Sequence, residues 1–334
     1  MFAFHVMGGK DIRAVIEKSR PEILARVRDT YLAHHRGETI NPRSYFLRFP
    51  EKPNARIIAL PALLGGAPGV AGIKWIGSFP DNVDRNIPRA SAVLLLNDFE
   101  TGHPFACLEA AQISAARTAA SAVLGAEALH GSRIARKIAV VGAGVISRNI
   151  LEFLRALDWE IGSVVVHDAV PDYADKAARY VEALGYHGSV SSTLAGALDG
   201  ADVVILATTA GEPHILDEDA LAPGQTVLNV SLRDIGPNLI AASHNVLDDV
   251  DHCLQADTSP HLAEQRLGHR DFIDGTLAEL LLGEITLGRD KPRIFSPFGL
   301  GVLDIAVGLE LFTTGLQAGR ALAVPDFFAE VARW

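Results

Sequence analysis

Charged side chains within apolar stretches of the sequence are the first candidates for chemistry. Lys74 interrupts the apolar run 72–76, and Arg117 lies within a stretch of alanine and serine. A lysine in such a run either faces solvent or is buried, and burial would lower its pKa so that it polarises a substrate or donates a proton. A helix made of small residues is expected to be buried, so the guanidinium of Arg117 needs an anion. A structural ion pair with Glu109 or Glu127 is the competing explanation, although neither acid has the spacing of a helical pair.

Two further arginines and one aspartate could complete a site for a charged substrate. Arg43 and Arg89 are isolated arginines in weakly charged stretches, where each could bind a carboxylate. Asp234 follows a predicted strand, and ligands of open α/β sheets bind outside the carboxyl ends of the strands. A carboxylate there can receive a proton from an amine or activate water. The alternative for Asp234 is ordinary turn chemistry before Gly236 and Pro237.

The residues between Lys137 and Ser147 carry the pattern of a dinucleotide site. An apolar, β-branched strand runs into Gly142, Ala143 and Gly144, and an amphipathic helix follows. The first glycine makes the turn, the second lets the backbone approach a pyrophosphate, and the free N–H groups of the helix start face the phosphates. Ser147 stands at the third glycine position, so an ordinary strand-to-helix turn is the alternative. The predicted cofactor residues of this turn are Gly142, Gly144, Val145, Ile146 and Ser147.

Polar residues after the next strands support the dinucleotide prediction and favour NAD. Asp168 ends the second strand, 26 residues after Gly142, where an acid is expected to bind the ribose hydroxyls. A carboxylate repels a 2′-phosphate, so Asp168 favours NAD over NADP. A surface aspartate that caps a turn is the alternative. Thr208 and Thr209 follow another strand and are predicted to line the cofactor cleft, with a local turn as the alternative.

The spacing of apolar residues predicts which elements position these side chains. Helical spacing over 11–36 has one break, and short apolar runs at 45–49, 57–60, 70–76 and 92–98 predict antiparallel strands. An alanine-rich helix is predicted over 108–129. Alternating strands and helices after residue 130 are typical of a doubly wound parallel sheet. A long apolar helix over 298–322 is expected to leave that sheet and pack on the N-terminal elements.

These elements predict the α/β class with two domains. A Rossmann domain is expected over 131–304, and a discontinuous α+β substrate-binding domain is expected over 1–130 and 305–334. We expect the working site to lie in the cleft between them.

Composition limits the classes of function. The chain has 334 residues, 49% of them hydrophobic and 21% charged, which is ordinary for a globular protein with two cores. A net charge of −10 without a cluster of basic residues argues against nucleic acid binding. We expect no metal, because the histidines lack metal-ligand spacing, and no membrane span. The two cysteines are far apart, and no signal peptide is recognised, so a cytoplasmic protein is expected.

With these residues in view, the chain resembles the ornithine cyclodeaminase/μ-crystallin family. The matching segments, in the same order, are Gly72-Ile73-Lys74-Trp75, Phe79-Pro80-Asp81-Asn82, Thr101-Gly102-His103-Pro104, Ser114-Ala115-Ala116-Arg117-Thr118-Ala119-Ala120, the glycine turn and Asp234. The resemblance implies that Arg43, Lys74 and Arg117 hold a substrate α-carboxylate and that Asp234 acts on the amine and on water. It also implies a homodimer assembled through the N-terminal domains.

One branch of the family is more similar than the others. Its likeness rests on Ile87-Pro88-Arg89-Ala90-Ser91-Ala92, Phe105-Ala106-Cys107-Leu108-Glu109 and Ser231-Leu232-Arg233-Asp234-Ile235. The branch implies NAD-dependent cleavage of N-(2-amino-2-carboxyethyl)-L-glutamate to 2-oxoglutarate and L-2,3-diaminopropionate, a precursor of siderophores and antibiotics. Three substrate carboxylates would explain Arg89, where ornithine cyclodeaminases typically have a small residue. The alternatives are cyclodeamination of ornithine to proline and ammonia, and a non-catalytic protein that binds a nicotinamide cofactor and a small ligand.

Overall fold

A computed structural model describes residues 3–66, 69–330 and 332, and the chain divides into two compact units. Unit 1 comprises Met1–Arg117 and Leu300–Trp334, and unit 2 comprises Thr118–Gly299. The predicted boundaries were residues 130 and 305. The chain passes from unit 1 to unit 2 within helix α3 (Ala111–His130), which is continuous through residue 130. The second half of α3 packs within unit 2, where a Cβ on Gly125 would lie 2.3 Å from the Phe295 ring.

Unit 1 is built on an eight-stranded sheet with the strand order β16-β1-β7-β6-β5-β4-β2, in which β3 also pairs with β4. Its elements are β1 (Phe4–Met7), α1 (Gly9–Ile16), α2 (Arg20–His35), β2 (Thr39–Ile40), β3 (Tyr45–Phe49), β4 (Lys52–Leu64), β5 (Val70–Ser78), the 3-10 helix η1 (Pro80–Arg85), β6 (Ala90–Asp98), β7 (Pro104–Glu109), α11 (Gly301–Gln317) and β16 (Leu322–Val324). Strands β3 to β6 pair antiparallel, as the sequence predicted, and β7, which was not predicted, pairs antiparallel with β6.

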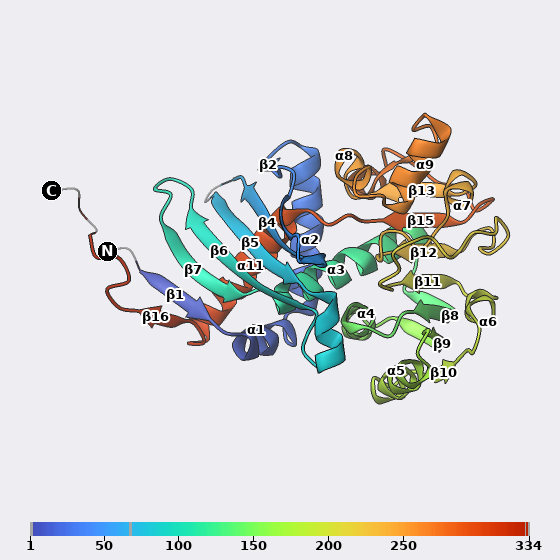
Figure 1. Ribbon diagram of the computed structural model, residues 1–334, viewed down its shortest axis with the longest axis horizontal. Helices are drawn as coiled ribbons and strands as arrows, with labels where there is room; N and C mark the ends of the chain where they lie inside the picture. The colour runs from blue at the N-terminus through green and yellow to red at the C-terminus, as the bar shows by residue number, and fades with distance from the viewer. Residues whose placement is uncertain (1–2, 67–68, 331, 333–334) are drawn as a thin grey trace. The chain divides into compact units, whose positions relative to one another are not determined.

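Helix α11 covers one face of this sheet (Figure 1). It is apolar around most of its circumference, which is typical of a helix buried on several sides. Glycine allows the close approach, because a Cβ on Gly308 would lie 2.1 Å from a methyl group of Leu94. Side chains alternate along β5, so Lys74 faces α11 and the neighbouring Trp75 faces away. The strand therefore directs one charged side chain into the core of unit 1.

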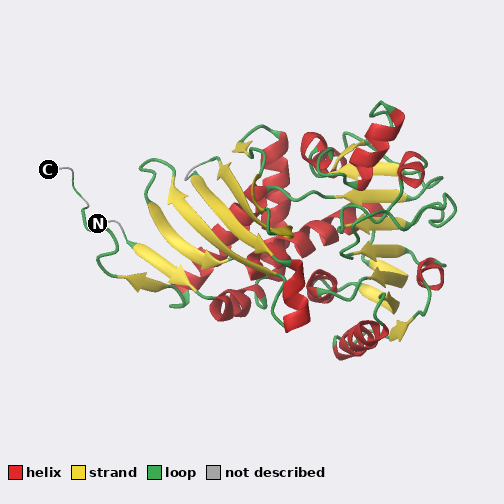
Figure 2. Ribbon diagram, viewed as in Figure 1, coloured by secondary structure: helices red, strands yellow, loops and turns green. Residues whose placement is uncertain are grey.

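Unit 2 contains an eight-stranded sheet in which all the pairs are parallel, with the order β10-β9-β8-β11-β12-β15-β13-β14. Its elements are β8 (Ile134–Val141), α4 (Val145–Ala156), β9 (Glu160–His167), α5 (Pro171–Ala183), β10 (Gly188–Val190), α6 (Leu194–Leu198), β11 (Val203–Leu206), β12 (Thr226–Asn229), α7 (Pro237–Ala241), β13 (His244–Leu247), α8 (Val250–Cys253), α9 (Ser259–Leu267), β14 (Gly275–Thr276), α10 (Leu277–Leu282) and β15 (Arg293–Ser296). Figure 2 shows helices on both sides of these strands, which confirms the predicted doubly wound sheet.

The chain reverses its direction of winding between β8 and β11, which are neighbours in the sheet although β9 and β10 intervene in sequence. Ligands of such sheets bind at this point, beyond the carboxyl ends of the strands. The glycine turn, Asp168, Thr208 and Asp234 follow β8, β9, β11 and β12 respectively, so all of them lie at this edge. Within the described part of the chain, no helix is both long enough and apolar enough to cross a membrane.

Candidate active site

A buried cluster of three charged side chains lies between the sheet and helix α11 in unit 1. The ammonium of Lys74 donates to Asp304 Oδ2 at 2.7 Å and to Ser114 Oγ at 3.1 Å. The guanidinium Nε of Arg117 donates to Asp304 Oδ1 at 3.3 Å. Lys74, Arg117 and Asp304 are 2%, 9% and 0% exposed. Two cations share one carboxylate, so the cluster carries one uncompensated positive charge while Lys74 is protonated.

Burial governs the proton affinity of this cluster. Desolvation lowers the pKa of Lys74 from 10.5 to about 8, because the charged ammonium is removed from water. The carboxylate of Asp304 opposes that shift, and the nearby charge of Arg117 adds to it. A further carboxylate near this cluster would offset the excess positive charge and favour the protonated lysine.

Arg117 is buried beside an anion, but the anion belongs to the protein. Neither of the acids weighed from the sequence is its partner. Glu109 instead caps α3 by accepting from the backbone N–H groups of Ala111 and Gln112, at 2.8 and 3.2 Å. Glu127 pairs with Arg133 at 2.8 Å.

Asp304 was not among the site residues predicted from the sequence. The available signal was a single acid within the buried run 301–308, because a buried charge requires a partner. Its two partners, Lys74 and Arg117, had already been singled out in the sequence as charged residues in apolar stretches.

The other two arginines of the predicted site are not part of this cluster. Arg43 precedes β3, Arg89 precedes β6, and both are exposed. Among the described residues, no contact joins either guanidinium to Lys74 or Arg117. Both remain available to solvent and to ligands.

The predicted glycine turn joins β8 to α4 in unit 2. Gly142 has φ +93°, and a Cβ there would lie 2.6 Å from the carbonyl oxygen of Ala207, so only glycine fits without strain. A Cβ on Gly144 would meet nothing within 4 Å, which leaves open space beside the start of α4. Ser147 is buried and its hydroxyl donates to the Gly142 carbonyl, which closes the turn.

The start of α4 is available to a ligand. Gly144 is the residue before the helix, no side chain caps it, and the first turn contains no acid. Val145 is 55% exposed and Ile146 is partly exposed. The free N–H groups at such a helix start can bind the phosphates of a dinucleotide.

Asp168 lies directly against the glycine turn. Its Oδ2 accepts from the backbone N–H of Ala143 at 2.8 Å, and its Oδ1 accepts from that of Val170 at 2.8 Å. These two contacts orient the carboxylate and leave lone pairs on both oxygens. The local capping role and the role of ribose ligand are therefore compatible.

Asp234 is fully buried and its carboxylate is only partly satisfied. Oδ1 accepts from the hydroxyl of Thr208 at 2.6 Å, while Oδ2 has no hydrogen-bond partner among the described residues. A buried carboxylate oxygen without a partner is costly, which is typical of a site that receives a proton or a ligand. Thr208 therefore contacts the candidate acid, and the neighbouring Thr209 is exposed.

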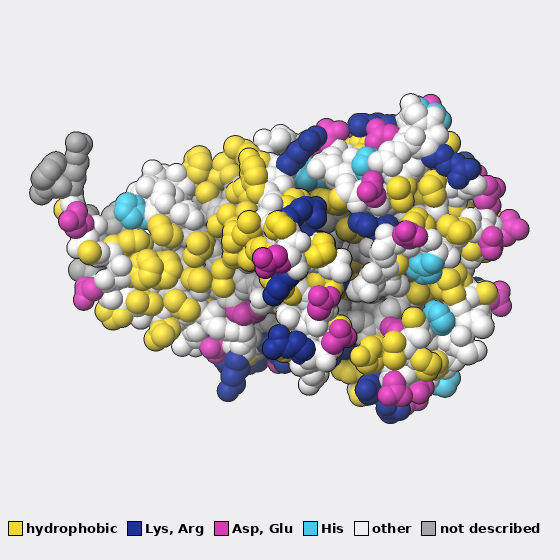
Figure 3. Space-filling view, viewed as in Figure 1, with side chains coloured by type: hydrophobic (Ala, Val, Ile, Leu, Met, Phe, Trp, Pro, Cys, Tyr) yellow, Lys and Arg dark blue, Asp and Glu magenta, His cyan; other side chains and the backbone are white. Residues whose placement is uncertain are grey.

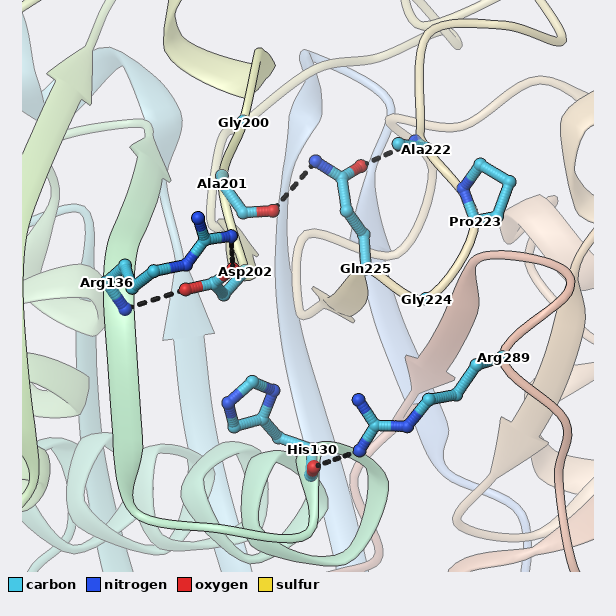
Figure 4. A pocket seen from close by; sticks show the side chains of 10 residues that line it. All are labelled: His130, Arg136, Gly200, Ala201, Asp202, Ala222, Pro223, Gly224, Gln225 and Arg289. Atoms are coloured by element: carbon cyan, nitrogen blue, oxygen red, sulfur yellow. Dashed lines mark hydrogen bonds and ion pairs between the residues drawn. The ribbon is translucent and has the colours of Figure 1, made fainter.

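A separate pocket of about 360 Å³ lies at the opposite edge of the unit 2 sheet, where β8, β11 and β12 begin (Figure 4). Arg136 pairs with Asp202 at 2.8 Å, and Gln225 bonds backbone groups, including the Ala201 carbonyl. None of the predicted site residues lines it. Within the described ranges, no group of three His, Cys, Asp or Glu side chains is arranged to hold a metal ion.

A family profile matches most of the chain. The Ornithine cyclodeaminase/mu-crystallin family matches residues 14–310. The chain belongs to this family. A relative from Staphylococcus aureus, N-((2S)-2-amino-2-carboxyethyl)-L-glutamate dehydrogenase, is 31% identical over 298 residues, which cover 85% of this chain and 87% of that protein. The alanine dehydrogenase of Archaeoglobus fulgidus is 27% identical over 314 residues, which cover 90% of this chain and 92% of that protein.

Solved structures of similar proteins share the fold of this family member. One is the Delta(1)-pyrroline-2-carboxylate reductase of Thermococcus litoralis in complex with NADH and L-proline, with a TM-score of 0.87 and 22% identity; it covers 96% of this chain and 99% of that chain. An archaeal alanine dehydrogenase dimer with bound NAD has a TM-score of 0.86 and 23% identity, and covers 98% of this chain and 100% of that chain. The family and the α/β fold predicted from the sequence are therefore confirmed.

Proposed function

We propose that the protein is an NAD-dependent amino-acid dehydrogenase that cleaves N-(2-amino-2-carboxyethyl)-L-glutamate to L-2,3-diaminopropionate and 2-oxoglutarate. The observation that carries the amino-acid dehydrogenase part of the proposal is the buried cluster of Lys74, Arg117 and Asp304, whose excess positive charge suits a substrate carboxylate. The relative named for this reaction supports the choice among amino-acid substrates.

The residues at the glycine turn fit NAD. Gly142 and Gly144 leave room for a pyrophosphate, and the uncapped start of α4 supplies N–H donors. The carboxylate of Asp168 suits ribose hydroxyls and repels a 2′-phosphate, so NAD is favoured over NADP. Bound there, NAD⁺ would supply the hydride acceptor for oxidation of the amine-bearing carbon to an imine.

The side chains of the protein then perform binding and proton transfer. Lys74 and Arg117 bind the α-carboxylate beside the reacting carbon and fix its position. Asp234 accepts a proton from water as the water oxygen bonds to the imine carbon, using the Oδ2 atom that lacks a partner. Collapse of the adduct breaks the C–N bond. Asp234 returns its proton to the departing amine of L-2,3-diaminopropionate and then accepts the hydroxyl proton of the adduct as the carbonyl of 2-oxoglutarate forms.

The remaining two carboxylates of the proposed substrate require their own partners. Arg43 and Arg89 are the candidates, because both guanidinium groups are exposed and belong to unit 1. An arginine that binds a distal carboxylate would repel the terminal ammonium of ornithine. The chemistry therefore favours the N-substituted glutamate over ornithine.

Product identification tests the proposal. Purified protein is incubated with NAD⁺ and one of three substrates, N-(2-amino-2-carboxyethyl)-L-glutamate, L-ornithine or L-alanine. The products of each incubation are identified by mass spectrometry. We expect NADH, 2-oxoglutarate and L-2,3-diaminopropionate from the first substrate alone. Formation of proline from ornithine without net NADH would show a cyclodeaminase instead. Binding of NAD⁺ with no turnover of any substrate would show a binding protein.

We also propose that the protein is a homodimer assembled through unit 1. The sheet face opposite α11 carries exposed apolar side chains, among them Trp75 and Val93, which are 43% and 41% exposed and face each other across β5 and β6. Leu47 on β3 is 48% exposed on the same face. Figure 3 shows hydrophobic side chains gathered over this part of unit 1. An apolar face of this kind favours a second copy of the chain.

A further inference from the structure

A short segment of unit 2 is fastened beside the loop that carries Asp234. The backbone N–H groups of His214 and Ile215 both donate to the carbonyl of Asp234, at 3.0 and 2.9 Å. Gly236 returns a bond from its own N–H to the carbonyl of Ile215 at 2.8 Å. The two segments form an isolated parallel bridge at this point. The position of His214 next to Asp234 is therefore fixed by the backbone of both segments.

The loop that carries Asp234 is itself held in a strained conformation. Leu232 has φ +77°, in the left-handed region that non-glycine residues rarely adopt. Ser259 holds it there, because its N–H donates to the Leu232 carbonyl at 2.7 Å and its hydroxyl accepts from the N–H of Ile235 at 3.2 Å. Strain of this kind persists where the surroundings determine the geometry, and it directs Asp234 inward.

The side chains at this point connect a buried acid to solvent. Asp234 is 0% exposed, and the hydroxyl of Thr208 occupies its Oδ1. The imidazole Nδ1 of His214 lies 4.0 Å from the same Oδ1, and its side chain is 37% exposed. Among the described residues it is the one titratable side chain within ion-pair distance of this carboxylate. A proton accepted by the buried carboxylate needs such a route to water.

We propose that His214 is a positioning residue that carries protons between Asp234 and solvent. The inference rests on the proposed function, in which Asp234 takes a proton from the attacking water. The hydroxyl proton that Asp234 accepts as the carbonyl forms passes from the carboxyl group to Nδ1 of His214, and Nε2 releases its own proton to solvent, which restores the carboxylate. The separation of 4.0 Å exceeds a direct hydrogen bond, so one bridging water or a small rotation of the imidazole completes the path.

The test compares His214→Ala and His214→Gln with wild type on whichever amine substrate the wild type oxidises. We expect the steady-state rate of the variants to fall about 10- to 100-fold, at or below the lower limit of the roughly 100- to 10,000-fold contribution of a general acid or base, because His214 acts through Asp234. The first-turnover formation of NADH is expected to change less than twofold, because carbon–hydrogen cleavage precedes the proton step. Added imidazole is expected to restore turnover of the alanine variant in proportion to its concentration. His269→Ala is the matched control, because His269 is also an exposed histidine beside an acid, Asp271, at 3.4 Å.

The possible outcomes test the role of His214 independently of the proposed substrate. Wild-type turnover in both variants would overturn the relay, and so would a loss of turnover that imidazole does not restore. The glutamine variant and the binding of NAD⁺ to each variant detect misfolding. Product analysis on the wild type decides the substrate independently, so an error there leaves the comparison of rates intact.

Discussion

Replacement of Lys74 by methionine isolates the electrostatic behaviour of the buried cluster. Methionine keeps an unbranched apolar chain, and Asp304 retains Arg117 as a partner. In the wild type, burial lowers the pKa of Lys74 from 10.5 to about 8, so the folded state disfavours the charged form. Below about pH 8 the lysine is protonated in both states and the whole penalty is present. As the pH rises from about 8 towards 10.5, the unfolded chain binds more protons than the folded protein, and stability rises.

The size of this effect follows from the same shift. The difference between the ordinary pKa of Lys74, 10.5, and its folded-state pKa of about 8 corresponds to a total of about 3.4 kcal/mol in the free energy of unfolding. Relative to neutral pH, deprotonation of Lys74 is expected to raise the free energy of unfolding by about 1.4 kcal/mol at about pH 9 and by about 2.5 kcal/mol at about pH 10. Urea unfolding of wild type and Lys74→Met at each pH measures it, because subtracting the two free energies removes the titration of every other group.

The affinity for a dicarboxylate ligand gives an independent measure of the charge on Lys74, and it is expected to fall as the pH rises, whereas the stability rises. Glutarate is a suitable probe because it stays doubly ionised over this range and lacks an amine. If it binds protonated Lys74, its affinity for wild type falls about tenfold between about pH 7 and about pH 9. Lys74→Met is expected to bind glutarate weakly, with no such dependence. Two results together would refute the assignment of a buried cationic lysine. One is a free energy of unfolding that changes equally with pH in wild type and variant, and the other is a glutarate affinity that does not change with pH in either protein.

Three further changes test other parts of the molecule. Asp304→Asn leaves two buried cations without an anion, so we expect a loss of about 3–5 kcal/mol in urea unfolding, and a loss below about 1 kcal/mol would contradict the charge balance. Gly142→Ala forces a Cβ against the Ala207 carbonyl at a positive φ; we expect at least about a tenfold loss of NAD⁺ affinity by calorimetry with glutarate binding unchanged, and intact NAD⁺ affinity would exclude this turn as the cofactor site. Trp75→Asp is expected to give a monomer in size-exclusion light scattering while the equally exposed Leu282→Asp does not, and a dimer that survives both changes would place the interface elsewhere.

The sequence predicted elements best where one spacing pattern persists over several residues. Strand β3 has the predicted bounds, and the strand before the glycine turn was recognised as its last four residues, 138–141. Strand β1 was missed because it is short and its pairing depends on distant partners, Ala106 in β7 and Ala323 in β16. Such pairings are tertiary, so local propensity carries little information about them.

The sequence predicted which charged residues of the candidate site would be buried or paired. It did not predict which side chain they contact. A cation in an apolar strand and another in a helix of small residues both had to be buried or paired, and the structure buries both Lys74 and Arg117. The partner was not predictable by spacing, because Asp304 lies 187 residues beyond Arg117 in the chain. The packing of α11 against β5 brings Asp304 to Lys74, and Arg117 reaches the same carboxylate from α3.

The charge balance of the cluster also limits what it can select. One net positive charge, buried beneath the sheet, matches one carboxylate, and every α-amino acid has one. The cluster therefore favours amino acids as a class and cannot by itself distinguish alanine from a substrate with three carboxylates. Discrimination must come from groups that meet the rest of the substrate, and exposed arginines such as Arg89 contribute less per ion pair than buried ones because water screens them. Selectivity for a tricarboxylate consequently requires several such contacts together, or their removal from water when the substrate binds.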